Sequence, residues 1–173
     1  SNTLFDSHPF KNVICTGVVK GTDGRKMSKS YGNYPDPKRV IGQLGGDALR
    51  LYLMSSGVMA GDNVNVNEDE IREQNQRCLS ILYNAYEYFI TYANIHKFQP
   101  RHFGGSETTE KSPSKSQDPL DQWILIKVKK FANDTAKYLD LYDVPHATRL
   151  IRPFIDDLST WYIRENRDRF VAG

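Results

Sequence analysis

Two lysines and two serines lie within five consecutive residues near the start of the chain. The stretch Lys26-Met27-Ser28-Lys29-Ser30 is preceded by the turn formers Asp23-Gly24 and followed by Gly32-Asn33. Lysines three residues apart on a turn can converge on one polyanion, and serine hydroxyls and backbone N–H groups can donate to phosphate oxygens. The residue types therefore favour a phosphate-binding loop. A lone Lys-x-x-Lys would not be specific, because most short basic loops are solvated surface.

A strand and short helices are predicted to position this loop. Residues 12–19, Asn-Val-Ile-Cys-Thr-Gly-Val-Val, are mostly apolar and rich in β-formers, which predicts a buried strand before the loop. After the loop, Asp36 can cap a helix with Pro37 at its first position, and Asp47 can cap a second helix that ends near Ser55. We expect this amino-terminal part to be a mixed α/β portion.

Three long amphipathic helices are predicted in the rest of the chain. The first follows Asn67 and Glu70, which have capping-box spacing, and runs to about residue 95; the second starts at Asp118-Pro119, and the third follows Asp143. Residues 99–118 have the composition of a flexible linker. We expect the helices to pack as a bundle.

The predicted buried positions of these helices recur at helical spacing. They are Cys78, Leu82, Ala85, Tyr86, Phe89 and Ala93 in the first helix, Leu120, Ile124, Val128, Phe131 and Leu139 in the second, and Ala147, Leu150, Ile151, Phe154, Leu158, Trp161 and Tyr162 in the third. The aromatic residues of the first helix could instead stack on bases, but their period favours a core role.

The composition is that of a globular chain without strong overall basicity. Of 173 residues, 39% are hydrophobic and 25% charged, and the formal net charge is +2. Any RNA-binding surface must therefore be a local patch. Arg164, Arg167 and Arg169 are the candidates, because Arg164 and Arg167 share a helix face and could contact an RNA backbone. Glu165 and Asp168 lie between them, so an ordinary ion-paired helix terminus is an equally open interpretation.

The cysteines and histidines do not predict a metal site. Cys15 and Cys78 have no Cys or His partner at metal-binding spacing, so we expect two buried thiols in a reducing compartment and no disulfide. The four histidines are scattered along the chain. No signal peptide and no apolar run of membrane length is evident, so no membrane contact is expected.

The loop and its surroundings resemble the second signature of the class I aminoacyl-tRNA synthetases. After residues 26–30 come Gly32-Asn33, Asp36-Pro37 and Gly46-Asp47-Ala48-Leu49-Arg50. This is similar to the family's order of signature loop, short helix and Gly-Ala-Asp-Ala-Leu-Arg segment, with Gly46 where alanine is common. The family's first signature, His-Ile-Gly-His, does not occur, and Ser7-His8-Pro9-Phe10 is no substitute for it.

The helical half narrows the resemblance to the isoleucyl-tRNA synthetases, with the valyl and leucyl enzymes as alternatives. The similar segments are Asn33-Tyr34-Pro35-Asp36-Pro37, residues 84–86 with 91–94, and residues 154–164. The resemblance implies a fragment that runs from the end of the catalytic domain (residues 1–62) into a helical anticodon-binding domain (residues 63–173). The expected fold is mainly α: a C-terminal helix bundle preceded by a small α/β remnant of the Rossmann-type catalytic domain.

The resemblance also implies an activity and roles for individual residues. The parent enzyme would use ATP and Mg²⁺ to activate isoleucine and transfer it to isoleucine tRNA, as a cytoplasmic monomer, and the fragment would be inactive alone. Lys26 and Lys29 would be catalytic, with Lys29 the principal charge stabiliser. Residues 26–30 would bind ATP: Ser28 and Ser30 would hold the loop or donate to phosphate, and Met27 would anchor the loop on an apolar surface.

Two functions without an enzymatic parent remain as alternatives. One is a free-standing helical RNA-binding module, and the other is a structural or interaction bundle in which the arginine cluster is mere surface. The strand and the phosphate-directed loop of the first sixty residues argue against the RNA-binding module, because a bare bundle needs neither.

Overall fold

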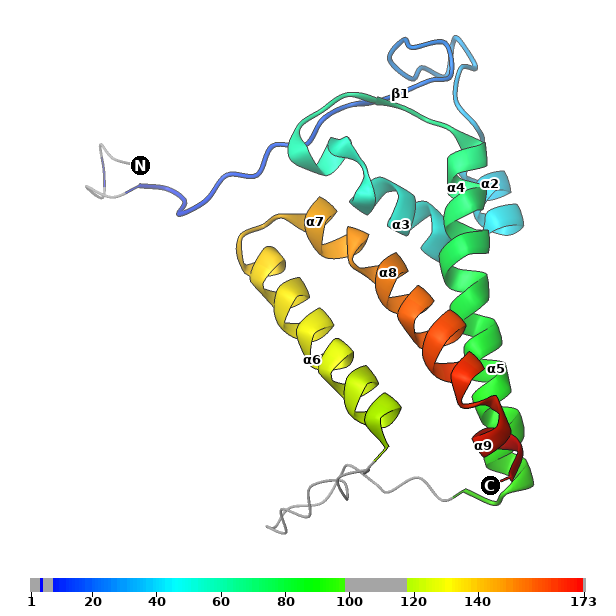
Figure 1. The fold of residues 1–173 in the computed structure, drawn as a ribbon. Helices are drawn as coiled ribbons and strands as arrows, with labels where there is room; N and C mark the ends of the chain where they lie inside the picture. Colours follow the sequence, from blue (N-terminus) through cyan, green and yellow to red (C-terminus); the bar gives the residue numbers. More distant parts are fainter. Residues whose placement is uncertain (1–3, 5–7, 99–117, 173) are drawn as a thin grey trace.

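The computed structural model describes residue 4 and residues 8–98 and 118–172 (Figure 1). Strands β1 (Val19–Lys20) and β2 (Val64–Asn65) form a parallel pair in which Val19 lies opposite Val64. Between them come helices α2 (Pro37–Leu44) and α3 (Gly46–Ser55) and the 3₁₀ turn η1 (Gly57–Ala60). The predicted α/β portion therefore exists, with a sheet that is only two residues long in each strand.

The remaining helices form three rods. The first rod is continuous through α4 (Glu68–Gln74), the π-helical segment η2 (Asn75–Leu79) and α5 (Ser80–Ile95). The second rod is α6 (Pro119–Asp140). The third contains α7 (Val144–Arg149), α8 (Ile151–Asp156), the π-helical segment η3 (Asp157–Ile163) and α9 (Arg167–Ala172). The predicted mainly α fold with a helical bundle is confirmed.

Local capping signals set most helix starts. The carboxylates of Asp36, Asp118 and Asp143 accept hydrogen bonds from first-turn N–H groups, and a proline follows each of them near the start of the helix. Asn67 accepts from Asp69 N–H at 3.0 Å and donates to Glu70 Oε1 at 3.1 Å. The prediction that Asp47 caps α3 is wrong by two residues, because Gly45 is the N-cap and Asp47 lies in the first turn.

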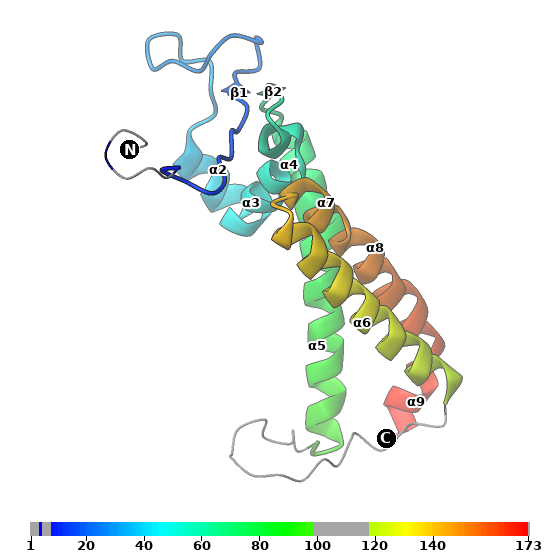
Figure 2. The same cartoon turned by 90° about the vertical axis from the view of Figure 1, so that its left-hand side faces the viewer.

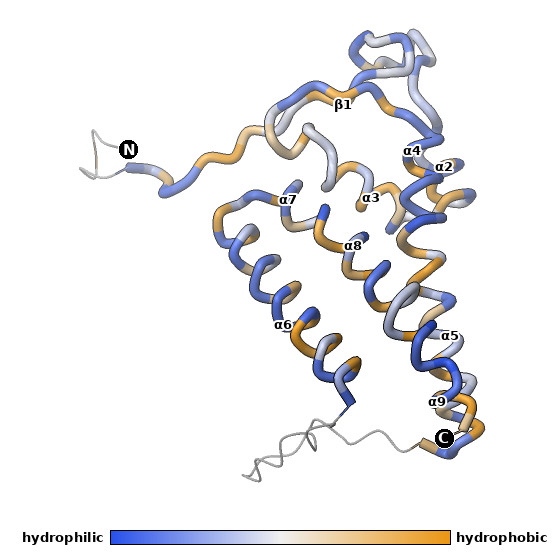
Figure 3. Tube along the Cα trace, viewed as in Figure 1, coloured by the Kyte–Doolittle hydropathy of each residue, from blue (hydrophilic) through white to orange (hydrophobic). Residues whose placement is uncertain are grey.

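The apolar run before the loop is not a buried strand. Only Val19 and Lys20 are paired, while Val13 and Ile14 are 68% and 55% exposed. Figure 3 shows this hydrophobic stretch as an extended segment beside the helices. It is tied down at Gly17, whose N–H donates to Val58 O at 2.7 Å. Among the described residues β2 is the only strand that pairs with β1, and no second layer covers residues 13–18.

Two hydrophobic clusters hold the described residues together. The first contains Val40, Leu44, Ala48, Tyr52, Val66 and Ile71, and the second contains Leu51, Cys78 and Ile155. Helix α3 contributes to both, so it joins the amino-terminal part to the bundle. The first cluster and the β1–β2 pair also span residue 62, and the domain boundary expected there stays a prediction.

Several predicted core positions are solvent-exposed. Leu82, Tyr86 and Phe89 of α5, Val128 and Leu139 of α6, and Trp161 of η3 are exposed, with Tyr86 and Trp161 both at 59%. The other predicted core positions are buried or half-buried. On α5 the buried position is Ala85, flanked by half-buried Ile81, Tyr88 and Tyr92. The apolar stripes are wider than the faces that the other described helices cover, and periodicity alone could not show this.

Helix α7 fixes the end of α3. The buried hydroxyl of Thr148 donates to Met54 O at 3.1 Å, and Arg149 Nε donates to Ser55 O at 3.2 Å. These carbonyls belong to the last turn of α3, where carbonyl groups have no N–H partner within the helix. In Figures 1 and 2 the loop after β1 lies at one end of the molecule and α9 lies at the other.

Part of the sequence prediction falls outside this description. All but the last residue of the predicted linker at 99–118 lies outside the described residues. Within the described ranges, no helix combines the length and the apolar character that crossing a membrane requires.

Candidate functional site

Residues 21–36 form the loop between β1 and α2, and its base is closed by backbone contacts. Gly21 N–H donates to Arg25 O at 2.9 Å, and Gly24 N–H donates to Gly21 O at 3.0 Å. Lys20 and Lys26 form an isolated antiparallel bridge. Gly24 has a φ of +77°, which glycine adopts without the strain of a side chain. The predicted turn before Lys26 is therefore present and brings Lys26 back against β1.

The side chain of Asn33 ties together three parts of the loop. Its Oδ1 accepts from Ser28 N–H at 3.0 Å, while its Nδ2 donates to Asp23 Oδ1 at 3.0 Å and to Lys26 O at 3.3 Å. Asp23 Oδ1 also accepts from Arg25 N–H at 3.0 Å. This hydrogen bond and the one from Asn33 lower the pKa of Asp23, because both favour the charged carboxylate.

Lys26 and Lys29 are both exposed on this frame. Among the described residues, neither lysine forms an ion pair with a carboxylate. Two ammonium groups without a carboxylate partner, three residues apart on one loop, create a local positive field that attracts a polyanion. The geometry therefore suits the phosphate-binding role expected from the sequence.

The two serines lie between and beside the lysines. Ser28 Oγ and Ser30 Oγ are 2.7 Å apart and share a hydrogen bond. Ser28 O accepts from Tyr31 N–H at 3.2 Å and from Gly32 N–H at 3.1 Å, which forms a tight turn with Gly32 at a φ of +57°. One serine hydroxyl hydrogen remains available beyond this shared bond, so the pair can hold the loop and still donate to an anion.

Met27 anchors the loop, as the sequence analysis expected. Its side chain is partly buried against the first hydrophobic cluster, where it joins Val40, Ala48 and Ile71. The flanking lysines point to solvent while Met27 points to the core, so the residue types of this stretch match its burial pattern.

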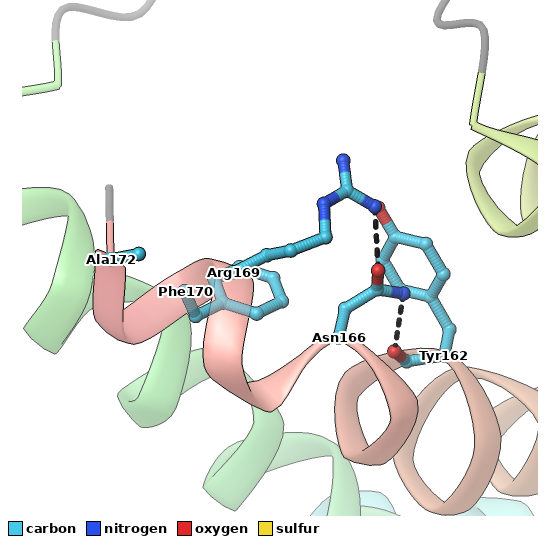
Figure 4. Close-up of a pocket in the computed structure, with 5 residues that line it drawn as sticks. All are labelled: Tyr162, Asn166, Arg169, Phe170 and Ala172. Carbon is cyan, nitrogen blue, oxygen red and sulfur yellow. Dashed lines mark hydrogen bonds between the residues drawn. The ribbon is translucent and has the colours of Figure 1, made fainter.

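The arginines expected to bind RNA lie at the opposite end of the molecule. Arg169 is held by its own chain: its guanidinium contacts Asp118 Oδ2 and both carboxylate oxygens of Asp121 at 3.0 Å each. It also donates to Asn166 Oδ1 at 2.5 Å, and Asn166, only 2% exposed, donates to Tyr162 O (Figure 4). The charge of Arg169 is therefore largely neutralised within the fold.

Arg164 and Arg167 differ from Arg169. Both are exposed, and neither forms an ion pair with a carboxylate among the described residues. Arg167 lies beside the hydroxyl of Tyr88 of α5. The alternative of an ion-paired helix terminus thus describes Arg169, while Arg164 and Arg167 keep unpaired charge.

The expectation of two buried thiols is half wrong. Cys78 is buried in the second hydrophobic cluster, and burial raises the pKa of its thiol. Cys15 is exposed, because the extended segment that carries it is not part of a covered sheet. Both are free thiols. Within the described ranges, no group of three or more His, Cys, Asp or Glu side chains is placed to hold a metal ion.

Sequence reasoning missed the residues that organise the loop. Asp23 and Asn33 were read only as turn formers, although short polar side chains beside glycines commonly bond to nearby backbone groups. The roles of Thr148 and Arg149 left no local signal, because the carbonyls that they contact lie 94 residues earlier in the chain.

The amino-terminal part of the chain, which contains the loop, matches a known protein family. The family described as tRNA synthetases class I (I, L, M and V) matches residues 1–66, which include β1, the loop, α2, α3 and β2.

Curated relatives extend the similarity over almost the whole chain. The chain is 43% identical over 171 residues to an isoleucine–tRNA ligase of Treponema denticola, covering 96% of this chain and 16% of the relative. It is 40% identical over 167 residues to that of Bdellovibrio bacteriovorus, covering 96% and 15%. It is 36% identical over 170 residues to that of Protochlamydia amoebophila, covering 98% and 16%. The chain thus spans about a sixth of the length of these relatives.

A solved structure supports the fold. The LeuRS of Agrobacterium radiobacter K84, solved in a ternary complex with tRNA and LeuAMS, superposes with a TM-score of 0.62 at 20% identity. The alignment covers 89% of this chain and 17% of that one. At this identity the likeness concerns the fold alone. The relatives above confirm the expected resemblance: the chain is similar to one segment of the isoleucine–tRNA ligases, and its residues 1–66 match the class I tRNA synthetase family.

Proposed function

We propose that this chain works as a segment of an isoleucine–tRNA ligase and supplies the loop of residues 26–30 to ATP-dependent activation of isoleucine. The observation that carries the proposal is the pair Lys26 and Lys29, which are exposed and have no carboxylate partner within the described ranges, on a loop that Asn33 ties together. The similarity to isoleucine–tRNA ligases over 96% of the chain supports isoleucine as the amino acid.

The electrostatics of the loop suit the chemistry of adenylate formation. The isoleucine carboxylate attacks the α-phosphorus of ATP, a carboxylate–phosphorus bond forms, and the bond to the pyrophosphate oxygen breaks. Negative charge grows on the phosphate oxygens and the leaving group, so positioned cations stabilise the transition state. In this proposal Lys29 is the principal charge stabiliser, Lys26 supports it, and Ser28 and Ser30 donate to phosphate oxygens or hold the loop.

The loop also has the means to move. Gly24 and Gly32 flank the lysines with positive φ angles, and in Figures 1 and 2 the backbone of the loop extends away from the helices. Met27 is the side chain of residues 26–30 that reaches the core. Rotation at the two glycines would let the lysines close on the triphosphate after ATP binds.

The family resemblance implies Mg²⁺ as the companion of ATP, but the described residues do not fit a metal site, because no group of three or more His, Cys, Asp or Glu side chains among them is placed to hold a metal ion. We therefore assign none of the described residues to Mg²⁺.

The helical half is proposed to contact isoleucine tRNA through Arg164 and Arg167. Their guanidinium groups at the end of the third rod are exposed and form no ion pair with any carboxylate in the described part of the chain, which suits contact with a phosphate backbone. Arg169 is left out of this role because Asp118 and Asp121 already occupy its guanidinium. A monomeric state and a cytoplasmic location stay predictions.

The test is isotopic pyrophosphate exchange by the full ligase polypeptide that contains this sequence. Exchange that depends on isoleucine, with valine and leucine much weaker, would support the proposal. Exchange that depends on valine or leucine would assign the segment to one of those ligases instead. No exchange with any amino acid, together with tRNA binding, would favour the stand-alone RNA-binding module.

A further inference from the structure

We propose that Asn33 is a positioning residue whose carboxamide fixes the backbone between Lys26 and Lys29 and so aims both ammonium groups at the triphosphate. This inference rests on the proposed function, because it assigns a role within the same loop. Its basis is the set of three hydrogen bonds that the Asn33 side chain makes to Asp23, Lys26 and Ser28.

These hydrogen bonds fix the backbone on both sides of Met27. Lys26 O lies in the peptide group before Met27, and Ser28 N–H lies in the peptide group after it. Asn33 donates to the first at 3.3 Å and accepts from the second at 3.0 Å. With the Met27 side chain in the core, the directions in which Lys26 and Lys29 leave the loop are set from both sides.

Asn33 is itself held in place by the other leg of the loop. Its Nδ2 donates to Asp23 Oδ1 at 3.0 Å, and Asp23 is fixed by Arg25 N–H at the same distance. The backbone is close as well: a β-carbon built on Gly21 would lie 2.1 Å from Asn33 O. These contacts hold Asn33 against the base of the loop.

An asparagine suits this position because it donates and accepts at once. Aspartate keeps the shape and the acceptor for Ser28 N–H, but it loses both donors and faces the Asp23 carboxylate with a like charge. Exchanging the two residue types, with Asp23→Asn and Asn33→Asp together, restores one donor–acceptor pair in the opposite direction. The double variant therefore tests whether the hydrogen bond between residues 23 and 33 matters.

The test uses the full ligase polypeptide and measures pyrophosphate exchange. Loss of positioning should lower kcat more than it raises KM for ATP, because both lysines keep their charge and lose only their direction. We expect Asn33→Asp to lower kcat by about 10- to 100-fold, in line with the cost of misplacing a reacting group by about 1 Å. The double swap should recover at least part of this loss. Asn94→Asp, which adds a charge on the exposed face of α5, serves as the control.

A second measurement reports the local stability of the loop directly. Amide hydrogen exchange of residues 26–30 should be faster in Asn33→Asp than in the native protein, with protection restored in the double swap and unchanged in α5. Native kcat together with unchanged loop protection in Asn33→Asp would overturn the positioning role. So would a double swap that is no better than Asn33→Asp in both measurements.

The two proposals fail in different ways. Lys29→Ala, measured in parallel, tests the proposed function. Full activity in this variant would exclude a catalytic role of the loop, independently of the result for Asn33. Activity lost in Lys29→Ala and retained in Asn33→Asp would remove only the positioning role.

Discussion

Arg169 of α9 and Asp121 of α6 form a two-point contact across 48 residues of sequence. Nη1 of Arg169 lies 3.0 Å from Asp121 Oδ1, and Nη2 lies 3.0 Å from Asp121 Oδ2. Tyr162 of η3 donates its hydroxyl hydrogen to the same Asp121 Oδ1 at 2.9 Å. Paired hydrogen bonds between a guanidinium and a carboxylate are among the stronger polar contacts of proteins. This contact joins α9 to the start of α6, and it leaves the charge of Arg169 largely neutralised.

The same contact predicts a loss of stability at alkaline pH. Burial and the hydrogen bond to Asp121 raise the pKa of Tyr162 to about 12, against 10.0 for an ordinary tyrosine. Between these values the unfolded chain releases a proton that the folded chain keeps, so the free energy of unfolding falls as pH rises from about 10 to about 12. Urea unfolding across this range should show a shallower fall in Tyr162→Phe than in the native chain. Identical slopes would contradict the assignment.

Thr148 should contribute to stability through its hydroxyl. It is buried and donates to Met54 O at the end of α3 or to carbonyls of its own helix. Thr148→Val keeps the shape and leaves these carbonyls with one donor fewer, so we expect a loss of about 1–2 kcal/mol in the free energy of unfolding. Thr148→Ser keeps the hydroxyl and should lose less. Native stability in Thr148→Val would show that the hydrogen bond of the hydroxyl does not contribute.

The two cysteines should differ in reactivity. Cys15 is exposed, whereas Cys78 is buried in the second hydrophobic cluster and burial raises the pKa of its thiol. A thiol-specific reagent at neutral pH should therefore modify one thiol at once and the second only when the chain is unfolded. Cys15→Ser should abolish the fast phase. A fast phase that survives in this variant would contradict the placement of Cys78.

The proposed RNA contact predicts a change in salt dependence. Arg164→Gln and Arg167→Gln should each weaken binding to isoleucine tRNA and reduce the slope of log K against log salt by about 1. Arg77→Gln is the control, because Arg77 is exposed but pairs with Glu73. Affinity measured at several salt concentrations separates the cases. Slopes in Arg164→Gln and Arg167→Gln that equal the slope of the control would remove these arginines from the interface.

The sequence predicted the features that depend on near neighbours. The sequence predicts the caps at Asp36 and Asn67 and the helix starts at Asp118 and Asp143, because each of these side chains bonds within three residues of itself. The loop was predicted from its residue types and from the family resemblance. The same resemblance implies that Met27 anchors the loop on an apolar surface, and Met27 packs against the first hydrophobic cluster.

The features that were missed depend on distant parts of the chain. Residues 12–18 have the composition of a buried strand, but burial needs covering layers, and β2 supplies only one paired edge. Tyr86 and Trp161 follow the helical period and are still exposed, because a period gives the faces of a helix and not which faces are covered. The Asn33 contacts depend on the chain reversal at Gly32, which returns residue 33 to residues 23 and 28.

The measurement that tests the central claim most directly is pyrophosphate exchange by the full ligase polypeptide carrying Lys29→Ala. Loss of a group that stabilises transition-state charge costs about 10²–10³-fold in kcat, so exchange with isoleucine should fall by about that factor. Lys38→Ala, which removes an exposed lysine from the start of α2, should leave exchange near the native rate. Near-native exchange in Lys29→Ala would contradict the claim that this loop stabilises the phosphate charge.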